Sequence, residues 1–283
     1  MKWFADLCQC LKNVACRTKQ EAQLLQHTQL QNRITELELY IYHTTAAQSF
    51  DYDADSLRVW NKNVDFMSDP RFRQAYFRGM DSGHQIGRAP GSHDDIHIEW
   101  RVHMLLWAAS HAAHLEGDFV ECGVNTGIFS LAICDYLDFN KTGKSFFLFD
   151  TFEGIPVEQM SEKEKAGKAE FNKTCFPECF EQAKANFQPY PSAILVRGKV
   201  PDTLTQVDIP KVAFLSIDLN IATPERLALC FFWDKLVSGA VIVLDDYGWK
   251  GYEEQKTALD DFARGKGVMI ATLPTGQGLL LKP

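Results

Sequence analysis

The sequence predicts an α/β fold with a seven-stranded, mostly parallel sheet that ends in an antiparallel hairpin. Short apolar runs alternate with segments of helical spacing over 119–281, a pattern typical of a parallel sheet with helices on both faces. Only Pro274–Gly278 separates the last two apolar runs, which is too short for a parallel crossover. We therefore expect the last two strands to pair antiparallel.

The apolar runs define the expected strands, and the segments between them define the expected helices. The strands are Phe119–Cys122, Ser145–Phe149, Ala193–Val196, Val212–Ile217, Ala240–Leu244, Val268–Leu273 and Leu279–Leu281. The helices are Ile128–Leu137, Pro177–Phe187, Pro224–Leu236 and Tyr252–Arg264. One more helix is expected before the first strand, because Ile98, Val102 and Leu105 lie on one helical face.

Three regions are expected along the chain. Residues 1–47 carry apolar positions at helical spacing and predict an amphipathic arm, which packs on its own domain, forms a homodimer, or anchors to a membrane surface through Trp3 and Phe4. Residues 48–96 begin with a polar linker and predict a helical cap with a glycine-rich lid over Gly79–His93. Residues 97–283 predict the sheet domain.

Composition excludes several classes of protein. The formal net charge is −8 without a cluster of Lys and Arg, which argues against nucleic-acid binding. No apolar run approaches the roughly 20 residues that a membrane span needs. The eight cysteines show no paired zinc-finger spacing, and Cys122 and Cys134 fall in an expected strand and helix. Buried thiols of this kind predict a reducing cytoplasm.

The glycine loop after the first strand predicts a nucleotide pocket. Gly123 and Gly127 allow a tight turn beneath a ligand, while Glu121 and Asp150 offer acceptors to a ribose and an ammonium group. The spacing is Gly-x-x-x-Gly and lacks the third glycine of a diphosphate-binding turn. It favours S-adenosylmethionine over a dinucleotide, and a nicotinamide-dependent oxidoreductase is the disfavoured alternative.

Carboxylates at the ends of two later strands predict a metal site. Asp218 ends the fourth strand, and Asp245 with Asp246 ends the fifth. If these strands are neighbours, the three side chains share one crevice, and their mutual repulsion favours a hard divalent cation such as Mg²⁺. Helix capping by Asp245 or Asp246 is the simpler alternative.

Three motifs together resemble the macrocin O-methyltransferase family, whose members methylate sugar hydroxyls of macrolides and related natural products. They are Gly117–Val124, Phe149–Pro156 and Val243–Gly248, and the resemblance extends over Ile98–Pro283. It implies the Rossmann-like class I methyltransferase fold. The family's donor is S-adenosylmethionine, and its acceptor is a small molecule or glycosyl group.

The resemblance also implies roles for individual residues. The cofactor-binding set predicted from it and from the glycine loop is Glu121, Gly123, Thr126, Gly127, Ser130, Asp150, Phe152 and Gly198. The implied Mg²⁺ ligands are Asp218, Asp245 and Asp246, and the predicted catalytic positions are Asp218 and Asn220. Aromatic cap residues such as Trp60 and Tyr76 are candidates for stacking on a sugar, with core packing as the alternative.

One residue departs from the family pattern. The fourth-strand motif of the family is Asp-Gly-Asp-Leu-Tyr, whose second Asp is the general base, but this chain has Asn220 there. An amide cannot accept the hydroxyl proton. Three accounts remain open: Mg²⁺ acidifies the hydroxyl while water or His84, His93 or His97 takes the proton; the acceptor is more acidic; or the protein is a non-catalytic, cofactor-binding partner. The first account predicts a Mg²⁺-assisted O-methyltransferase for a sugar, glycoconjugate or polyketide-like product.

Overall fold

The computed structural model describes residues 25–38, 50–89 and 91–283. The chain divides into two compact units, Met1–Asp51 with Val59–Asn61 and Tyr52–Arg58 with Lys62–Pro283. In the first unit, the described residues include a helix over 25–38, all of it exposed. The rest of the predicted arm lies outside the described residues. No helix in the described ranges is long and apolar enough to cross a membrane.

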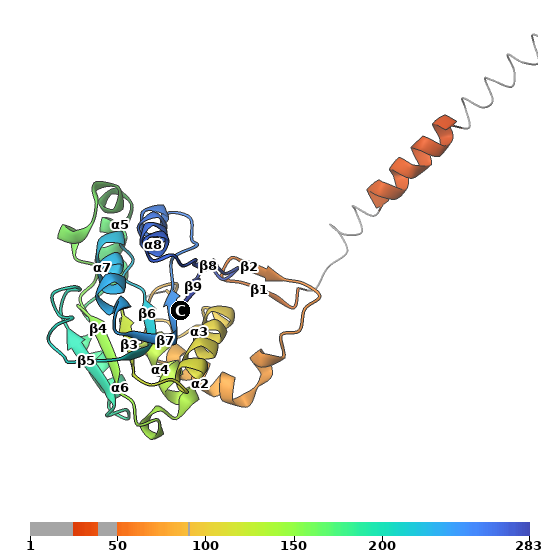
Figure 1. Cartoon of the computed structure of the whole chain (residues 1–283). Coiled ribbons are helices and arrows are strands. Elements are labelled where there is room, and N and C mark those ends of the chain that lie inside the picture. Colours follow the sequence, from red (N-terminus) through yellow and green to blue (C-terminus); the bar gives the residue numbers. More distant parts are fainter. Residues whose placement is uncertain (1–24, 39–49, 90) are drawn as a thin grey trace, which may run out of the picture. The chain divides into compact units, whose positions relative to one another are not determined.

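A seven-stranded sheet forms the centre of the second unit (Figure 1). Its strands are β3 (Asp118–Cys122), β4 (Phe146–Asp150), β5 (Ala193–Arg197), β6 (Val212–Ile217), β7 (Leu236–Leu244), β8 (Ala271–Thr272) and β9 (Gly278–Leu281). They are ordered β5-β4-β3-β6-β7-β9-β8, and β9 runs antiparallel to both neighbours. The predicted mostly parallel sheet with a closing hairpin is confirmed, and β9 inserts between β7 and β8.

Helices cover both faces of this sheet. They are α2 (Pro70–Met80), α3 (Glu99–Ala112), α4 (Ile128–Leu137), α5 (Glu162–Cys175), α6 (Phe180–Phe187), α7 (Ala222–Trp233) and α8 (Glu253–Lys266). Single 3₁₀ turns lie at Asp65–Ser68, Phe139–Lys141 and Val157–Gln159. Buried side chains of α2, α3, α4 and α6 pack with one face of the sheet, and those of α7 and α8 pack with the other.

Phenylalanine rings fill the centre of the first face. Phe119 on β3 is paired with Phe146 on β4 and Phe214 on β6, and all three side chains are fully buried. The Phe119 ring centroid lies 5.1 Å from that of Phe214 and 5.8 Å from that of Phe146. This packing fixes β3 between β4 and β6, so that the carboxyl ends of the three strands meet at one edge.

Two expected boundaries differ from the structure. The helix predicted to reach Leu236 ends at Trp233, and β7 already starts at Leu236 rather than Ala240. Gly239 has φ +83° where the β6–β7 register shifts, so an irregularity interrupts the apolar run that marks the strand. At the end of the chain, β8 contains only Ala271–Thr272 of the predicted Val268–Leu273.

Two elements were not predicted. The hairpin of β1 (Tyr52–Ala54) and β2 (Leu57–Val59) lies partly in the stretch that we expected to be a linker. Asp55 and Ser56 at its turn both have positive φ, at 48° and 58°, as a tight hairpin turn requires. The helix α5 was also not predicted, because it is rich in Lys and Glu and has too few apolar residues to show a helical period.

The helix α2 lies in the region predicted to be a cap. Asp69 begins this helix by accepting a hydrogen bond from the Phe72 N–H, and Pro70 occupies the first turn. Phe72 and Tyr76 are buried, and α2 packs on α4. The helix therefore contributes to the core of the second unit. The expected boundary at residue 96 stays a prediction.

Two helical glycines test the α2–α4 contact. A Cβ at Gly79 would lie 2.2 Å from the Ile128 carbonyl oxygen, whereas a Cβ at Gly167 in α5 would meet nothing within 4 Å. We expect Gly79→Ala to lower the free energy of unfolding by about 1–3 kcal/mol through overpacking. Gly167→Ala should raise it by up to about 1 kcal/mol through helix propensity. Chemical denaturation measures both, and equal effects would contradict the packing of α2 on α4.

Candidate active site

A cavity of about 410 Å³ opens at the carboxyl ends of β3, β4, β6 and β7. Residues of the glycine loop, the β4 end and the acidic strand ends line its wall. Its lining includes Gly123, Asn125, Asp150, Phe152, Gly198, Asp218, Asn220, Asp245 and Asp246. The sequence-predicted crevice therefore exists, and it is formed where the strand order changes direction.

Gly123 allows β3 and β6 to approach closely at this edge. Its φ is +92°, and a Cβ there would lie 1.8 Å from the Asp218 carbonyl oxygen. Any other residue would clash with the backbone of β6. The Gly123 N–H donates to the Phe149 carbonyl at 2.8 Å, so the loop is tied to both neighbouring strands.

Asp150 holds the glycine loop against the end of β4. Its Oδ2 accepts hydrogen bonds from the N–H groups of Val124 at 2.6 Å and Asn125 at 2.8 Å. Its Oδ1 accepts one from the Phe152 N–H at 2.6 Å. The Thr151 hydroxyl also lies 3.4 Å from Oδ1, but its single hydrogen has a closer acceptor in the Gly154 carbonyl at 2.6 Å. Since a carboxylate has about four acceptor positions, the three backbone bonds leave Asp150 about one for a ligand hydroxyl.

The predicted cofactor-binding residues fall into two groups. Gly123, Asp150, Phe152 and Gly198 line the cavity. The other four, Glu121, Thr126, Gly127 and Ser130, are not part of its lining. The Thr126 hydroxyl lies 2.9 Å from that of Ser82, and a Cβ on Gly127 would meet the Phe187 ring at 2.6 Å. Thr126 and Gly127 therefore contact residues outside the cavity lining and support the glycine loop from there.

Glu121 is a buried acid beneath the cavity. It is 1% exposed, and neither carboxylate oxygen has a hydrogen-bond partner among the described residues. Its pKa is raised to about 8, chiefly by burial and to a smaller extent by the charges of Asp218 and Asp150, while Ser130 acts in the opposite direction. Glu121 is therefore largely protonated at neutral pH, unlike an ordinary surface acid.

The three strand-end aspartates come together as predicted. Carboxylate oxygens of Asp218, Asp245 and Asp246 lie within 4.8 Å of one another. Burial raises the pKa of Asp218 and of Asp246, and their mutual proximity adds to the rise at Asp218. Asp246 Oδ2 is buried without a hydrogen-bond partner among the described residues. An all-oxygen donor set with an unpartnered buried atom fits a hard divalent cation.

Arg101 on α3 supplies a positive charge at this cluster. Its guanidinium donates to both oxygens of Asp245, and its Nη1 lies 3.8 Å from Asp55 Oδ1. Gln277 Nε2 donates to Asp245 Oδ1 at 3.1 Å. Asp245 thus accepts three hydrogen bonds from side chains, so it has fewer free acceptor positions than Asp218 and Asp246.

Asn220 is held in a fixed orientation beside Asp218. Its φ is +64°, and its Nδ2 donates to Asp218 Oδ1 at 3.0 Å. The Asn220 N–H donates to Glu225 Oε1 at 3.0 Å, and the Tyr252 hydroxyl donates to Asn220 Oδ1 at 3.4 Å. Lys168 on α5 donates to the Asn220 carbonyl. The amide therefore orients its neighbours and cannot accept a proton.

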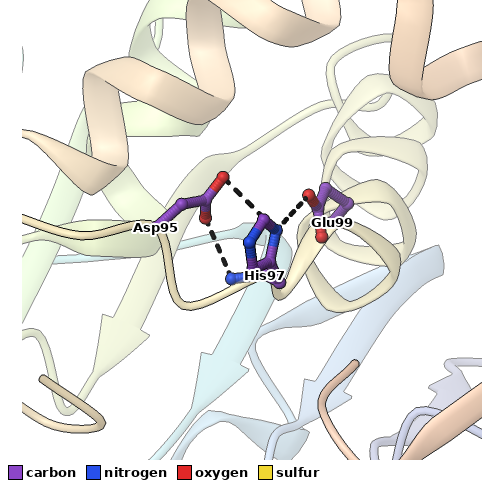
Figure 2. A group of neighbouring side chains, drawn as sticks. All are labelled: Asp95, His97 and Glu99. Atoms are coloured by element: carbon purple, nitrogen blue, oxygen red, sulfur yellow. Dashed lines mark hydrogen bonds and ion pairs between the residues drawn. The ribbon is translucent and has the colours of Figure 1, made fainter. Parts of the chain in front are cut away.

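The three candidate histidines are placed differently. His84 lines the cavity, its Nδ1 has no hydrogen-bond partner among the described residues, and burial lowers its pKa to about 4. His93 is exposed. Figure 2 shows His97 between Asp95 and Glu99, with its Nδ1 3.2 Å from Glu99 Oε1 and 3.6 Å from Asp95 Oδ2. None of the residues in that cluster lines the cavity.

The two aromatic residues suggested by the sequence for stacking on a sugar are not among the residues that line the cavity. Tyr76 is buried and its hydroxyl donates to Asp95, so its role is core packing. Trp60 is half exposed and is absent from the cavity lining. Trp249 and Tyr252 line the cavity instead, next to Asp246 in the chain.

Comparison with known proteins assigns the chain to a family. A family model described as macrocin-O-methyltransferase (TylF) matches residues 103–272, more than half of the chain. The chain belongs to the macrocin O-methyltransferase family. It is accordingly an S-adenosylmethionine-dependent O-methyltransferase. None of the curated proteins compared with it matches.

Two solved structures are similar in fold. The O-methyltransferase NovP is 19% identical, with a TM-score of 0.59 over 74% of this chain and 87% of NovP. The calicheamicin methyltransferase CalS11 is 14% identical, with a TM-score of 0.53 over 82% of this chain and 95% of CalS11. At this identity the likeness shows the shared class I methyltransferase fold.

Several residues of this macrocin O-methyltransferase site were missed by sequence reasoning. Arg101, Lys168 and Glu225 lie on helices, and only the fold brings them to the strand ends. The sequence does contain one indication of Arg101, because a charged residue beside the apolar face of a helix is unusual. For Gln277, in the loop before β9, the sequence carries no comparable signal.

The raised pKa of Glu121 predicts how the stability of the protein depends on pH. A raised pKa in the folded state means that the folded chain binds more protons than the unfolded chain between about pH 4.5 and 8, so stability falls as pH rises through that window. Glu121→Gln should remove this loss. We expect the substitution to raise the melting temperature relative to the unsubstituted protein. This increase should be several degrees larger at pH 8 than at pH 5.

The exposed Glu116, which pairs with Lys211, provides the matched control. Glu116→Gln should show nearly the same difference at both pH values. If Glu121→Gln behaved like this control, the conclusion that Glu121 is a buried carboxyl with a raised pKa would be wrong.

Proposed function

We propose that this protein is a Mg²⁺-assisted O-methyltransferase that acts on a hydroxyl of a sugar, glycoconjugate or polyketide-like natural product. The observation that carries the proposal is the arrangement of one cavity. The glycine loop with Asp150 lies at one part of its wall, and Asp218, Asp245 and Asp246 lie at another. A donor and an acceptor can therefore meet in one cavity.

The donor side of the site is formed by Gly123, Asp150, Phe152 and Gly198. We assign to Asp150 a hydrogen bond with a ribose hydroxyl, using its remaining acceptor position. Phe152 and Gly198 border the part of the cavity suited to a flat base. S-adenosylmethionine supplies an electrophilic methyl group on a sulfonium, and the chain's work is to hold it in line with the acceptor oxygen.

The metal side of the site is formed by Asp218, Asp245 and Asp246. Mg²⁺ held there would supply positive charge that stabilises a developing alkoxide. Arg101 contributes charge at the same place and pairs with Asp245. Asn220 orients the Asp218 carboxylate through its 3.0 Å hydrogen bond.

His84 is the proposed proton acceptor. Because its pKa is lowered to about 4, its imidazole stays neutral over the physiological range. The residue lines the cavity, and its Nδ1 has no hydrogen-bond partner among the described residues. A base of this strength is weak, so it suits a hydroxyl that positive charge has already made more acidic. This assignment replaces the proton acceptor that Asn220 cannot provide.

The acceptor class follows from the cavity wall and the relatives. Trp249 and Tyr252 offer aromatic faces near the carboxylates, which suits stacking on a glycosyl ring. NovP is named an O-methyltransferase and CalS11 a calicheamicin methyltransferase, which supports a natural-product acceptor. We further propose that the enzyme works in the cytoplasm and as a homodimer. A non-catalytic, cofactor-binding partner is the second candidate, favoured only by Asn220.

The enzyme proposal predicts separate effects on donor binding and turnover. S-adenosylmethionine should raise the melting temperature of both the unsubstituted protein and Asp246→Asn. Methyl transfer to a panel of glycosides, followed by mass spectrometry, should fall about 100-fold in Asp246→Asn and on removal of Mg²⁺. Asp261→Asn, on the exposed face of α8, is the control and should be active. No thermal shift with S-adenosylmethionine would sink the proposal.

The pairing of Arg101 with Asp245 predicts competition with the metal. Arg101→Gln should bind Mg²⁺ about tenfold more tightly by calorimetry, because charge-assisted hydrogen bonds to Asp245 no longer have to be exchanged. Arg264→Gln removes an exposed guanidinium elsewhere and should leave the affinity unchanged. Weaker Mg²⁺ binding in Arg101→Gln would show that Arg101 supports the site without competing for it.

A further inference from the structure

The helix over 25–38 carries a narrow apolar stripe on an otherwise polar surface. Leu30, Ile34 and Leu37 lie on it and are 60%, 39% and 47% exposed. A helix of this length is marginal in water by itself, so a surface that covers the stripe would stabilise it. The three positions span a narrower arc than the apolar face of a helix that packs on a globular core.

The spacing of the stripe is that of a coiled-coil seam. Leu30, Ile34 and Leu37 are four and three residues apart, and Ile41, outside the described residues, continues the spacing in the sequence. An alternation of four and three gives a period of 3.5, which keeps one edge of a helix against a partner helix. Leu25 lies off this edge and takes no part in the seam.

The identities along the seam specify the number of strands. In heptad notation Ile34 and Ile41 occupy position a, and Leu30 and Leu37 occupy position d. Branched Ile at a with Leu at d favours two parallel strands over higher assemblies. The partner best matched to such a seam is a helix with the same residues in the same register.

The flanking charges point to the same partner. Arg33 occupies position g and Glu38 the following position e. In a parallel pair, position g of one helix lies beside the following position e of the other. Arg33 of each copy would therefore pair with Glu38 of the other copy, which gives two equivalent ion pairs. An antiparallel pair would place like charges together. Arg33 now bonds Glu36 at 2.8 Å, but both side chains are about two-thirds exposed and such a pair is readily exchanged.

We propose that this helix forms a parallel, two-stranded coiled coil with the same helix of a second copy of the chain. Leu30, Ile34 and Leu37 form its seam over the described residues. Arg33 and Glu38 set its direction and its preference for self-pairing. The proposal does not depend on the reaction that the enzyme catalyses.

Sedimentation velocity of the full chain over a range of concentrations tests the seam. The unsubstituted protein should reach the mass of a dimer, whereas Ile34→Glu and Leu37→Glu should be monomeric. Asn32→Glu adds the same charge at the outward position f and should still dimerise. A full chain that is monomeric throughout, or seam variants that dimerise as tightly as the control, would overturn the proposal.

A charge exchange tests the direction. Arg33→Glu and Glu38→Arg should each weaken dimerisation about tenfold, and the double variant should restore it. A double variant as weak as either single change would contradict the parallel register. The thermal shift with S-adenosylmethionine, measured on every variant, reports whether the methyltransferase domain is folded. If the unsubstituted protein showed no thermal shift with S-adenosylmethionine, that result would contradict the enzyme proposal and leave the coiled-coil proposal unaffected.

Discussion

The contact between Gly123 and the Asp218 backbone is the constraint on which the site depends. With no room for a Cβ between them, the turn that follows β3 rests directly on the end of β6. This contact brings the glycine loop and the acidic cluster to one cavity wall, although almost a hundred residues separate them in the sequence. The phenylalanine packing around Phe119 sets the same strand neighbours from inside the core.

A second constraint is electrostatic. Glu121, Glu225 and Asp246 are buried near one sheet edge and Asp218 is partly buried there, and removal from solvent raises the pKa of each. Against them the structure places two cations from outside the strands, Arg101 and Lys168, and burial lowers the pKa of Lys168. A further cation at this edge would favour the ionised form of these carboxyls.

The sequence predicts the strands and the closing hairpin because apolar runs alternate with helical segments and the last connection is short. It leaves the order of the strands at the site as a condition, which the structure fulfils. It also predicts the meeting of Asp218, Asp245 and Asp246, since all three end neighbouring strands. Its failures have a different physical origin. Lys168 reaches the strand ends through the packing of α5, and α5 has too few apolar residues to reveal its period. Arg101 reaches them through the packing of α3, and its charge beside an apolar helix face is the one local sign of this position. Glu121 is not part of the cavity lining, and its role at the ligand stays a prediction.

The attachment of α5 has a consequence for how the enzyme can diversify. Glu164 closes the capping box at its start and also accepts the Ala222 N–H at the start of α7, while Lys168 reaches Asn220. Further along, Phe171 lines the cavity from a half-exposed position. Anchoring and cavity lining thus reside on different turns of one helix. Evolution can therefore alter the shape of the cavity from the distal turns without disturbing the contacts that hold α5 to α7 and to Asn220.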